Sequence, residues 1–457
     1  MSRIVVAAIV AVVCLGLGSE ARAFTFEKVI DNTSELVDSF GIPHLNDVGQ
    51  VVFHGTKDGV AGLYVAAVDQ DPQLVVDQSH PLFDSFDPFA FINNSGTVVG
   101  WAQGEDGEDQ YVFTGSAGGS VDIIAETNAT YDDLATAPSI NDDGLVAFAS
   151  DTRTRIHTRA YPDPAATMVD TTGDFNTFWL PLINNQQAIS FAGFDNEKGA
   201  VYRLDDAGLT MIMDNQGEFT GVLPYSTPNS AGEVAIHARR PSTAPSRWAI
   251  LRGDGDSLQT LVEAADHGFA DSAFDLEIND HGLVAFGPRM ASDSSLALYF
   301  HDGDDLRKVL QRGDPLFGDT VRDVFFARGL NQNNQVAFMY LLDNDELGIA
   351  TTTLVDPGIL VGDMNFDGVV DTGDVAPFVL ALTDPEAYQS QQAVDEATMV
   401  AAGDVNGDGV FDTGDVAPFV QLLVGAGASV PEPGTLVLLG AAALALLRRG
   451  GGRRSGA

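Results

Sequence analysis

The sequence predicts a mainly β protein, in which a seven-bladed repeat domain of the β-propeller type is followed by a small α-helical module. Two observations lead to this prediction. A short phrase, apolar-Asn-x-x-Gly-x-Val-x-Phe, recurs seven times along the middle of the chain, and an acid-rich dodecamer occurs twice near the C-terminus. The length of 457 residues also exceeds what one hydrophobic core organises, so more than one domain is expected.

The first 23 residues have the pattern of a signal peptide. Arg3 precedes an apolar run over residues 4–17, and Ala21 and Ala23 supply small residues at the positions that a signal peptidase inspects. We therefore expect residues 1–23 to be removed on export. The only cysteine, Cys14, lies in this segment, so the mature chain would have neither a disulfide nor a thiol nucleophile.

The charge of the chain excludes a class of partners. Its 23 basic and 65 acidic residues give a formal net charge of -42. Such a charge repels nucleic acids and anionic membrane surfaces, and it keeps an exported protein soluble. We therefore predict no nucleic-acid function.

The repeated phrase predicts a strand, a tight turn and a second strand. Asn and Gly reach positive φ at low cost, and the alternating Val-x-Phe presents one apolar face. Copies four and seven have Gln187 and Asn334 in place of the Gly, and Gln187 makes its turn harder to predict. The asparagines are Asn46, Asn93, Asn141, Asn184, Asn229, Asn279 and Asn331, spaced by 47, 48, 43, 45, 50 and 52 positions. Such periods are typical of propeller blades or arrays.

One period has room for four strands, which is the number in a propeller blade. In the first period the strand-like runs are residues 50–56, 62–68, 73–78 and 87–93. The ends of the repeat region hold half units, at 24–30 and 39–46 before the first phrase and at 335–342 and 348–355 after the seventh. We expect these half units to form one composite blade that closes a seven-bladed ring over residues 24–355. Open stacked sheets or an array of sandwiches is the alternative.

No motif in the repeat region predicts a catalytic residue. The chain has no Gly-x-Ser-x-Gly elbow, no His-Glu-x-x-His helix and no phosphate-binding Gly-Lys-Ser/Thr loop. Its eight histidines lack metal spacing, whereas its many acids leave open a carboxylate pair for glycoside cleavage. Aromatic residues gather near the phrases and either pack between blades or form a binding face: Phe86, Phe89, Phe91, Trp101, Phe175, Phe178, Trp179, Phe325 and Phe326.

The two dodecamers, residues 363–374 and 404–415, predict two bound Ca²⁺ ions. Each places oxygen side chains at positions one, three, five, nine and twelve and Gly at position six, and position seven contributes its backbone. Without a cation the four carboxylates of each loop repel one another, so folding of residues 356–428 should depend on calcium. The predicted ligands are Asp363, Asn365, Asp367, Val369, Asp371, Asp374, Asp404, Asn406, Asp408, Val410, Asp412 and Asp415.

Each loop is followed by an apolar helical stripe. Val375, Phe378, Val379 and Leu382 recur at helical spacing, and so do Val416, Phe419, Val420 and Leu423. We expect two short helices that bury these stripes against each other, with Pro377 and Pro418 in the first turns. Residues 383–402 between the copies suggest an additional helix. Val370 and Phe411, at loop position eight, would let the loops pair.

The duplicated loop and helix over residues 362–424 resembles a type I dockerin. The resemblance implies calcium binding and docking onto a cohesin-like scaffold protein, or else calcium that only stabilises the module. Dockerins commonly accompany carbohydrate-active enzymes, so the alternative function is a propeller-based polysaccharide lyase or glycoside hydrolase. The positions that would face a cohesin are Thr372, Gly373, Val379, Thr413, Gly414 and Val420.

The C-terminus resembles the PEP-CTERM sorting signal of Gram-negative bacteria. Pro431-Glu432-Pro433 precedes an apolar segment at 435–447 and the pair Arg448-Arg449. That segment is shorter than the roughly 20 residues of a membrane-spanning helix. The resemblance implies that an exosortase processes residues 430–457 and that the protein reaches the cell surface or extracellular matrix after transient anchoring. A plain membrane anchor is the alternative.

The repeats are also similar to the tandem NxxGxxxAF-type repeats of bacterial surface proteins, which carry no assigned activity. Taken together, these patterns predict an exported, surface-sorted, calcium-binding protein with a binding or architectural role. Its expected partners are a cohesin-like scaffold and an extracellular polysaccharide.

Overall fold

A computed structural model shows two compact units, one with Phe24–Thr353 and the other with residues from Leu354 onward. Each unit is described by itself. The predicted signal peptide and the tail from residue 430 lie outside the described residues. The structure describes residues 24–33, 39–105, 107–127, 130–171, 175–195, 198–224, 226–241, 247–270, 275–354, 361–365, 370, 372–392, 396–405 and 411–425.

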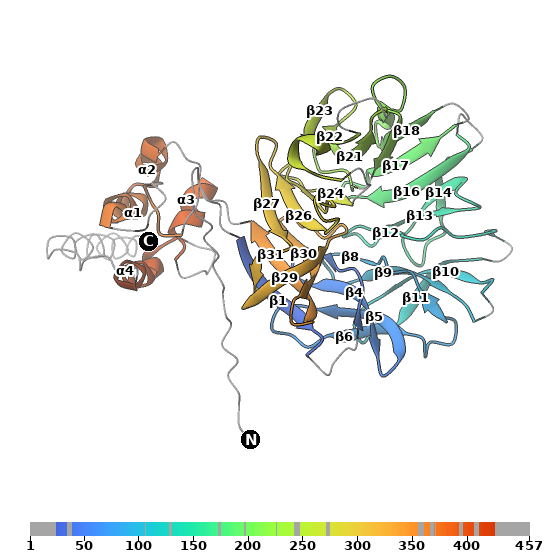
Figure 1. Cartoon of the computed structure of the whole chain (residues 1–457), viewed down its shortest axis with the longest axis horizontal. Coiled ribbons are helices and arrows are strands. Elements are labelled where there is room, and N and C mark those ends of the chain that lie inside the picture. The colour runs from blue at the N-terminus through green and yellow to red at the C-terminus, as the bar shows by residue number, and fades with distance from the viewer. Residues whose placement is uncertain are drawn as a thin grey trace, which may run out of the picture. The chain divides into compact units, whose positions relative to one another are not determined.

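The first unit is a seven-bladed β-propeller, as the repeats predict. Its seven antiparallel sheets stand around a common centre (Figure 1). Blade 1 contains β2 (Ser39–Phe40), β3 (His44–Leu45), β4 (Val51–Lys57), β5 (Val60–Ala66) and β6 (Gln73–Asp77). Blade 2 contains β7 (Ser85–Phe86), β8 (Phe91–Ile92), β9 (Val98–Gln103), β10 (Gln110–Gly115) and β11 (Val121–Glu126). Blade 3 contains β12 (Ser139–Ile140), β13 (Val146–Ser150), β14 (Arg155–Arg159) and β15 (Ala166–Asp170).

The next three blades each have four strands. Blade 4 contains β16 (Thr177–Ile183), β17 (Ile189–Phe194), β18 (Gly199–Asp205) and β19 (Gly208–Asp214). Blade 5 contains β20 (Gly221–Pro224), β21 (Val234–Arg239), β22 (Trp248–Gly253) and β23 (Leu258–Glu263), followed by the 3₁₀ turn η1 (Ala264–His267). Blade 6 contains β24 (Leu276–Ile278), β25 (Val284–Phe286), β26 (Ala297–His301) and β27 (Leu306–Gln311).

Blade 7 joins the two ends of the domain. Its order is β1 (Phe24–Asp31), β31 (Leu347–Leu354), β30 (Gln335–Leu342), β29 (Asp319–Phe325) and β28 (Pro315–Leu316). The predicted composite blade therefore exists, and closing the ring in this way removes an open edge between the first and last blades.

The composition of this composite blade differs from the prediction in one respect. Residues 39–46 do not belong to it, because β2 and β3 pair with β4 in blade 1. The N-terminus contributes only β1, and β29 supplies the inner strand instead. The physical reason is the short turn at Asn46: strands joined by so few residues pair with each other, so each blade begins before its phrase rather than after it.

The phrases form the predicted turns, including the one at Gln187. Gly49 has a φ of 81°, and Gln187 and Asn334 adopt the same left-handed region with φ of 61° and 57°. After each turn, the last residue of the phrase enters the core between strands. Phe53, Phe148, Phe191, Phe286 and Phe338 are all fully buried there.

The second unit is helical. It contains η2 (Thr372–Asp374), α1 (Val375–Thr383), α2 (Pro385–Gln392), α3 (Glu396–Gly403), η3 (Thr413–Asp415) and α4 (Val416–Gly425). The two predicted stripes meet, since the rings of Phe378 and Phe419 stack in parallel with centroids 4.0 Å apart. Phe411 meets Phe378 edge-on at 5.2 Å. The segment between the two copies forms two helices, α2 and α3, rather than one.

None of the helices in the described part of the chain is long and apolar enough to cross a membrane. The apolar segment predicted at 435–447 lies outside that part.

Closure by β1 can be tested at Phe26, which is 6% exposed and meets Phe338 edge-on at 6.2 Å. We expect Phe26→Ala to lower the free energy of unfolding of the propeller by about 3 kcal/mol, because it empties a packed site. Phe325→Ala, on a residue of the same blade that is 36% exposed, should cost much less. Chemical denaturation measures both, and equal effects would contradict the packing of β1.

Candidate functional site

The seven repeat asparagines form a closed hydrogen-bonded ring at one end of the propeller. The side-chain Nδ2 of each donates to the backbone oxygen of the asparagine in the next blade. From Asn46 onward the seven distances are 2.8, 3.0, 3.2, 3.4, 3.3, 3.1 and 3.0 Å, and the last runs from Asn331 back to Asn46. Every blade is thus tied to its neighbour by the same side chain.

The oxygen of each asparagine side chain makes a second hydrogen bond, within its own blade. It accepts the backbone N–H four residues further on, at 2.8 to 3.1 Å, and so closes its own turn. These side chains are at most 9% exposed. The arrangement explains why the phrase contains Asn rather than Asp, since only the amide offers both an acceptor and a donor.

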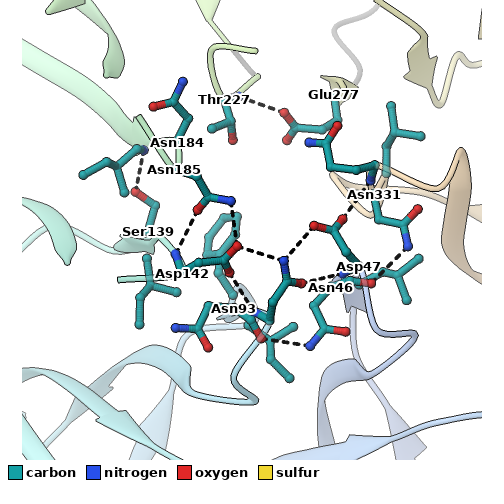
Figure 2. A pocket seen from close by; sticks show the side chains of 18 of the residues that line it. Asn46, Asp47, Asn93, Ser139, Asp142, Asn184, Asn185, Thr227, Glu277 and Asn331 are labelled. Atoms are coloured by element: carbon teal, nitrogen blue, oxygen red, sulfur yellow. Dashed lines mark hydrogen bonds between the residues drawn. The ribbon is translucent and has the colours of Figure 1, made fainter. Parts of the chain in front are cut away.

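A second ring of contacts is formed by the residue that follows each asparagine. Its members are Asp47, Asn94, Asp142, Asn185, Ser230, Asp280 and Gln332. For six of the seven neighbouring pairs, a side-chain oxygen of one blade accepts the backbone N–H of the other at 2.6 to 2.9 Å. The remaining pair is Asn185 and Ser230, where the serine side chain is shorter. Figure 2 shows several of these residues converging.

These rings border a cavity of about 130 Å³ at the mouth of the propeller. The position two residues before each asparagine differs from blade to blade: His44, Phe91, Ser139, Leu182, Thr227, Glu277 and Gly329. Five of these, all except Leu182 and Gly329, line the cavity, and no Lys or Arg is among the described residues that line it. The residues that repeat hold the ring, whereas those that vary determine the chemistry of its centre.

Glu277 is the buried acid of this cavity. It is 5% exposed, and its Oε1 accepts the backbone N–H of Thr227 at 2.8 Å. Burial raises the pKa of Glu277 to about 8, although the positive charge of Arg328 acts in the opposite direction. The side chain is therefore mostly protonated at neutral pH.

His44 lies in the same cavity, in blade 1. Its ring meets Phe91 edge-on, with centroids 4.6 Å apart, and its Nδ1 is buried without a hydrogen-bond partner. Burial lowers the pKa of His44 to about 3, and the charge of Arg328 contributes to the shift. The imidazole is therefore neutral, so a nitrogen can accept a hydrogen bond.

A second cavity, of about 300 Å³, lies between blades 6, 7 and 1. Its walls include Ile42, Phe325, Phe326 and Met339, together with Asp275. Burial raises the pKa of Asp275.

Of the aromatic residues considered from the sequence, Phe91, Phe178 and Phe326 are buried, whereas Trp179 and Phe325 are 39% and 36% exposed. The aromatic residues therefore mainly pack.

The predicted calcium ligands are described only in part. Asp363, Asn365, Asp374, Asp404, Asp412 and Asp415 belong to the described residues, and Asp367, Val369, Asp371, Asn406, Asp408 and Val410 lie outside them. Within that described portion no group of three or more His, Cys, Asp or Glu side chains is placed to hold a metal. The calcium sites consequently stay a prediction.

The described ends of both loops are nevertheless ordered around buried carboxylates. Asp363, Asp374 and Asp415 are at most 1% exposed. Asp374 Oδ1 accepts the backbone N–H groups of Met364 at 2.7 Å and Asn365 at 3.0 Å, so the last loop residue holds the first ones. In the second copy, Asp415 Oδ2 accepts the N–H of Asp412 at 2.9 Å.

Comparison with known proteins gives a family for the chain. The model of a family of unknown function, DUF7453, matches residues 125–420. The chain belongs to this family. The match of the DUF7453 model runs from blade 2 through the helical unit into α4. No dockerin or other calcium-module family matches, and no curated protein matches this DUF7453 chain in sequence.

The tail of this DUF7453 protein matches the PEP-CTERM protein-sorting motif over residues 429–454. The protein is therefore exported, processed by an exosortase and sorted to the cell envelope or surface.

Solved structures resemble the propeller at low identity. Virginiamycin B lyase from Staphylococcus aureus is 11% identical with a TM-score of 0.41, and the match covers 73% of this chain and 100% of that chain. A puromycin-hydrolyzing peptidase from Mycobacterium tuberculosis is 14% identical with a TM-score of 0.46, over 71% of this chain and 54% of that one. Oligopeptidase B from Leishmania major is 11% identical with a TM-score of 0.45, over 66% and 45%. The chain thus spans about half of either peptidase, and the likeness concerns only the fold.

The donor role of the asparagine ring can be tested by Asn141→Asp. The backbone oxygen of Asn184, now 3.2 Å from the amide nitrogen, would lose this donor and face a negatively charged oxygen instead, although it still accepts the N–H of Gln187 at 3.1 Å. We expect the free energy of unfolding to fall by about 2 kcal/mol. Asn344→Asp is the matched control, because the exposed Asn344 side chain accepts the N–H of Glu346 at 2.9 Å, which a carboxylate can also do. A change at Asn344 as large as that at Asn141 would refute the donor role.

The state of Glu277 makes the stability of the propeller depend on pH. Its pKa is about 8 in the folded chain and near the ordinary value of 4.5 when unfolded, so the folded state binds the extra proton between these values. Stability from this proton is complete below pH 4.5 and is lost as the pH rises through 8. We expect unfolding measured from pH 5 to 9 to show wild type losing stability relative to Glu277→Gln. A constant difference between the two proteins would show that Glu277 does not titrate in this way.

Proposed function

We propose that this exported, exosortase-sorted protein binds calcium through its helical unit and has a binding or architectural role at the cell surface or in the extracellular matrix. In this proposal two calcium ions complete the fold of the helical unit, and the unit docks the propeller to a partner. Export and sorting follow from the tail motif. The calcium and the docking are the proposed part.

The observation that supports calcium is an excess of buried negative charge. Residues 356–428 include thirteen Asp and Glu residues but no Lys, Arg or His. Asp363, Asp374 and Asp415 are nevertheless buried. The N–H groups bonded to Asp374 and Asp415 carry no net charge, and burying negative charge costs several kcal/mol, so a cation from solution would balance this charge.

The donor set suits calcium better than a softer metal. Carboxylate, amide and backbone oxygens are the ligands of hard cations, and the spacing within each dodecamer is that of a calcium loop. Residues 363–374 would hold one ion and residues 404–415 the other. Binding of the two ions would fix the first turns of α1 and α4. This would hold the rings of Phe378 and Phe419 in their stacked arrangement.

The surface at the loop-to-helix junctions supports docking. Thr372 and Gly373 are exposed in the first copy, and Thr413 and Gly414 are exposed in the second. Small exposed residues at equivalent places make a surface that a partner can approach closely. A cohesin-like scaffold protein is the proposed partner of this surface, and an extracellular polysaccharide is a proposed ligand of the protein.

We favour binding over the alternative of a polysaccharide-active enzyme. The carboxylates of the second ring are engaged between blades: Asp47 accepts from the N–H of Gln332 at 2.8 Å and from Asn94 Nδ2 at 2.7 Å. Asp142 Oδ2 accepts from the side chains of Asn94 and Asn185 at 2.8 and 2.6 Å. These bonds give both carboxylates a structural role.

Calcium binding can be tested by calorimetry on the mature chain after removal of bound metal. We expect two ions to bind, and each occupied site to raise the stability of the helical unit by about 2.7 kcal/mol when the calcium concentration is 100 times the dissociation constant of that site. Asp415→Asn should remove one ion, because the carboxylate at loop position twelve is a main ligand. Asp384→Asn, at an exposed acid of the same unit outside both loops, should leave two. An absence of binding, or a stoichiometry unaffected by Asp415→Asn, would overturn the proposal.

A further inference from the structure

The cavity at the mouth of the propeller has features that the calcium proposal does not use. We propose that this cavity binds a compact primary ammonium group, with Glu277 and His44 as hydrogen-bond acceptors. The inference concerns the propeller, goes beyond the proposed function and does not depend on it.

The charge of the lining selects a cation. Among the residues that the structure describes, four acids line the cavity, namely Asp47, Asp142, Glu277 and Asp280, and no Lys or Arg does. Arg328 is the nearby cation, but it is 3% exposed and its guanidinium lies over the Phe91 ring at 5.9 Å, outside the lining. An anionic ligand would meet repulsion here, whereas a cation would be attracted.

Two polar groups of the cavity could accept hydrogen bonds from a ligand. Glu277 accepts the backbone N–H of Thr227 at 2.8 Å, and the positive charge of Arg328 acts on its carboxyl group. The Nδ1 of His44 is buried and has no hydrogen-bond partner. Figure 2 shows the carboxyl of Glu277 directed toward Thr227, with their hydrogen bond drawn as a dashed line. Buried polar groups are usually paired, so these two are acceptors prepared for a ligand with donors.

A primary ammonium group fits these acceptors. It carries three donors, no acceptor and one positive charge. A carboxylate and a neutral imidazole nitrogen would take two of the donors, and oxygens of the surrounding rings can take the third. A metal ion suits the site less, since the described residues offer no group of three His, Cys, Asp or Glu for it.

The size of the cavity limits what can carry the ammonium group. Its volume of about 130 Å³ is below the roughly 300–1,000 Å³ of pockets for drug-sized ligands. It can admit the end of a lysine side chain or a single amino-sugar ring. These two sources share one chemistry, and the experiment below separates them.

Binding should release a proton. Glu277 is mostly protonated in the free protein at neutral pH, and a bound ammonium would favour its ionised form. The other titratable or charged groups around it are Arg328, His44, Asp275 and Asp280; His44 is already neutral. Affinity for the ammonium should therefore rise with pH toward about 8, by at most about tenfold per pH unit, and then level off.

The experiment is calorimetric titration of the mature chain with two pairs of probes at pH 7. One pair is Nα-acetyl-lysine amide and its Nε-acetylated form, and the other is glucosamine and N-acetylglucosamine. We expect at least one free amine to bind and its acetylated counterpart to bind at least tenfold more weakly. Repeating the titration in buffers of different ionisation enthalpy should reveal the released proton. Binding of only the lysine probe would indicate a polypeptide as the source, and binding of only glucosamine an amino sugar.

Variants connect the binding to the site. Glu277→Gln keeps the shape and the neutral state of the side chain, so it should fold, yet it should lose at least tenfold in affinity together with the proton release and the pH dependence. Glu27→Gln, at an exposed acid on β1, should bind as wild type does. Asp415→Asn should also bind the amine normally, which separates this test from the test of calcium.

Three results would overturn the proposal. The first is that neither amine binds between pH 7 and 8. The second is that the amines and their acetylated forms bind equally well, and the third is that Glu277→Gln retains full binding. Near-ultraviolet circular dichroism of each variant shows whether a loss of binding arises from a loss of folding.

Discussion

The propeller depends on one interaction, the buried side-chain amide of an asparagine that serves two blades at once. Its oxygen closes its own turn, and its nitrogen holds the backbone of the next blade. Each bond contributes only about 1 kcal/mol, but seven such bonds act together around the closed ring. Because the ring closes from Asn331 to Asn46, the same bond also joins the first and last copies of the repeat.

This ring leaves the centre of the propeller free to vary. The asparagines and the buried phenylalanines stabilise the fold. The positions two residues before each asparagine are not needed for this and can differ from blade to blade. Blade 6 uses its position for Glu277 and blade 1 for His44, both of which need hydrogen-bond partners that the fold supplies incompletely. Polar groups kept in a buried site at some expense in stability are typical of functional centres.

The helical unit is stabilised in a different way. It is small, has no cysteine and buries a modest core around Phe378 and Phe419. Small domains of this kind often need an additional stabilising device, and in our proposal a cation bound by the acidic loops is that device. The chain therefore combines a large domain closed by its own amides with a small one that, in our proposal, calcium completes.

The sequence by itself determined the seven units, their asparagine turns, the helical stripes after the acidic loops and the sorting motif, because each is a local pattern with a short period. Only the tertiary structure decided that β1 alone crosses to blade 7, since residues 24–30 and 39–46 look equally suited to that role as isolated strands. It also decided that the asparagine nitrogen bridges blades and that Glu277 and His44 line one cavity, where the charge of Arg328 acts on both. These residues are far apart along the chain. A local sequence pattern therefore cannot predict that they lie close together, because closure of the ring brings them there.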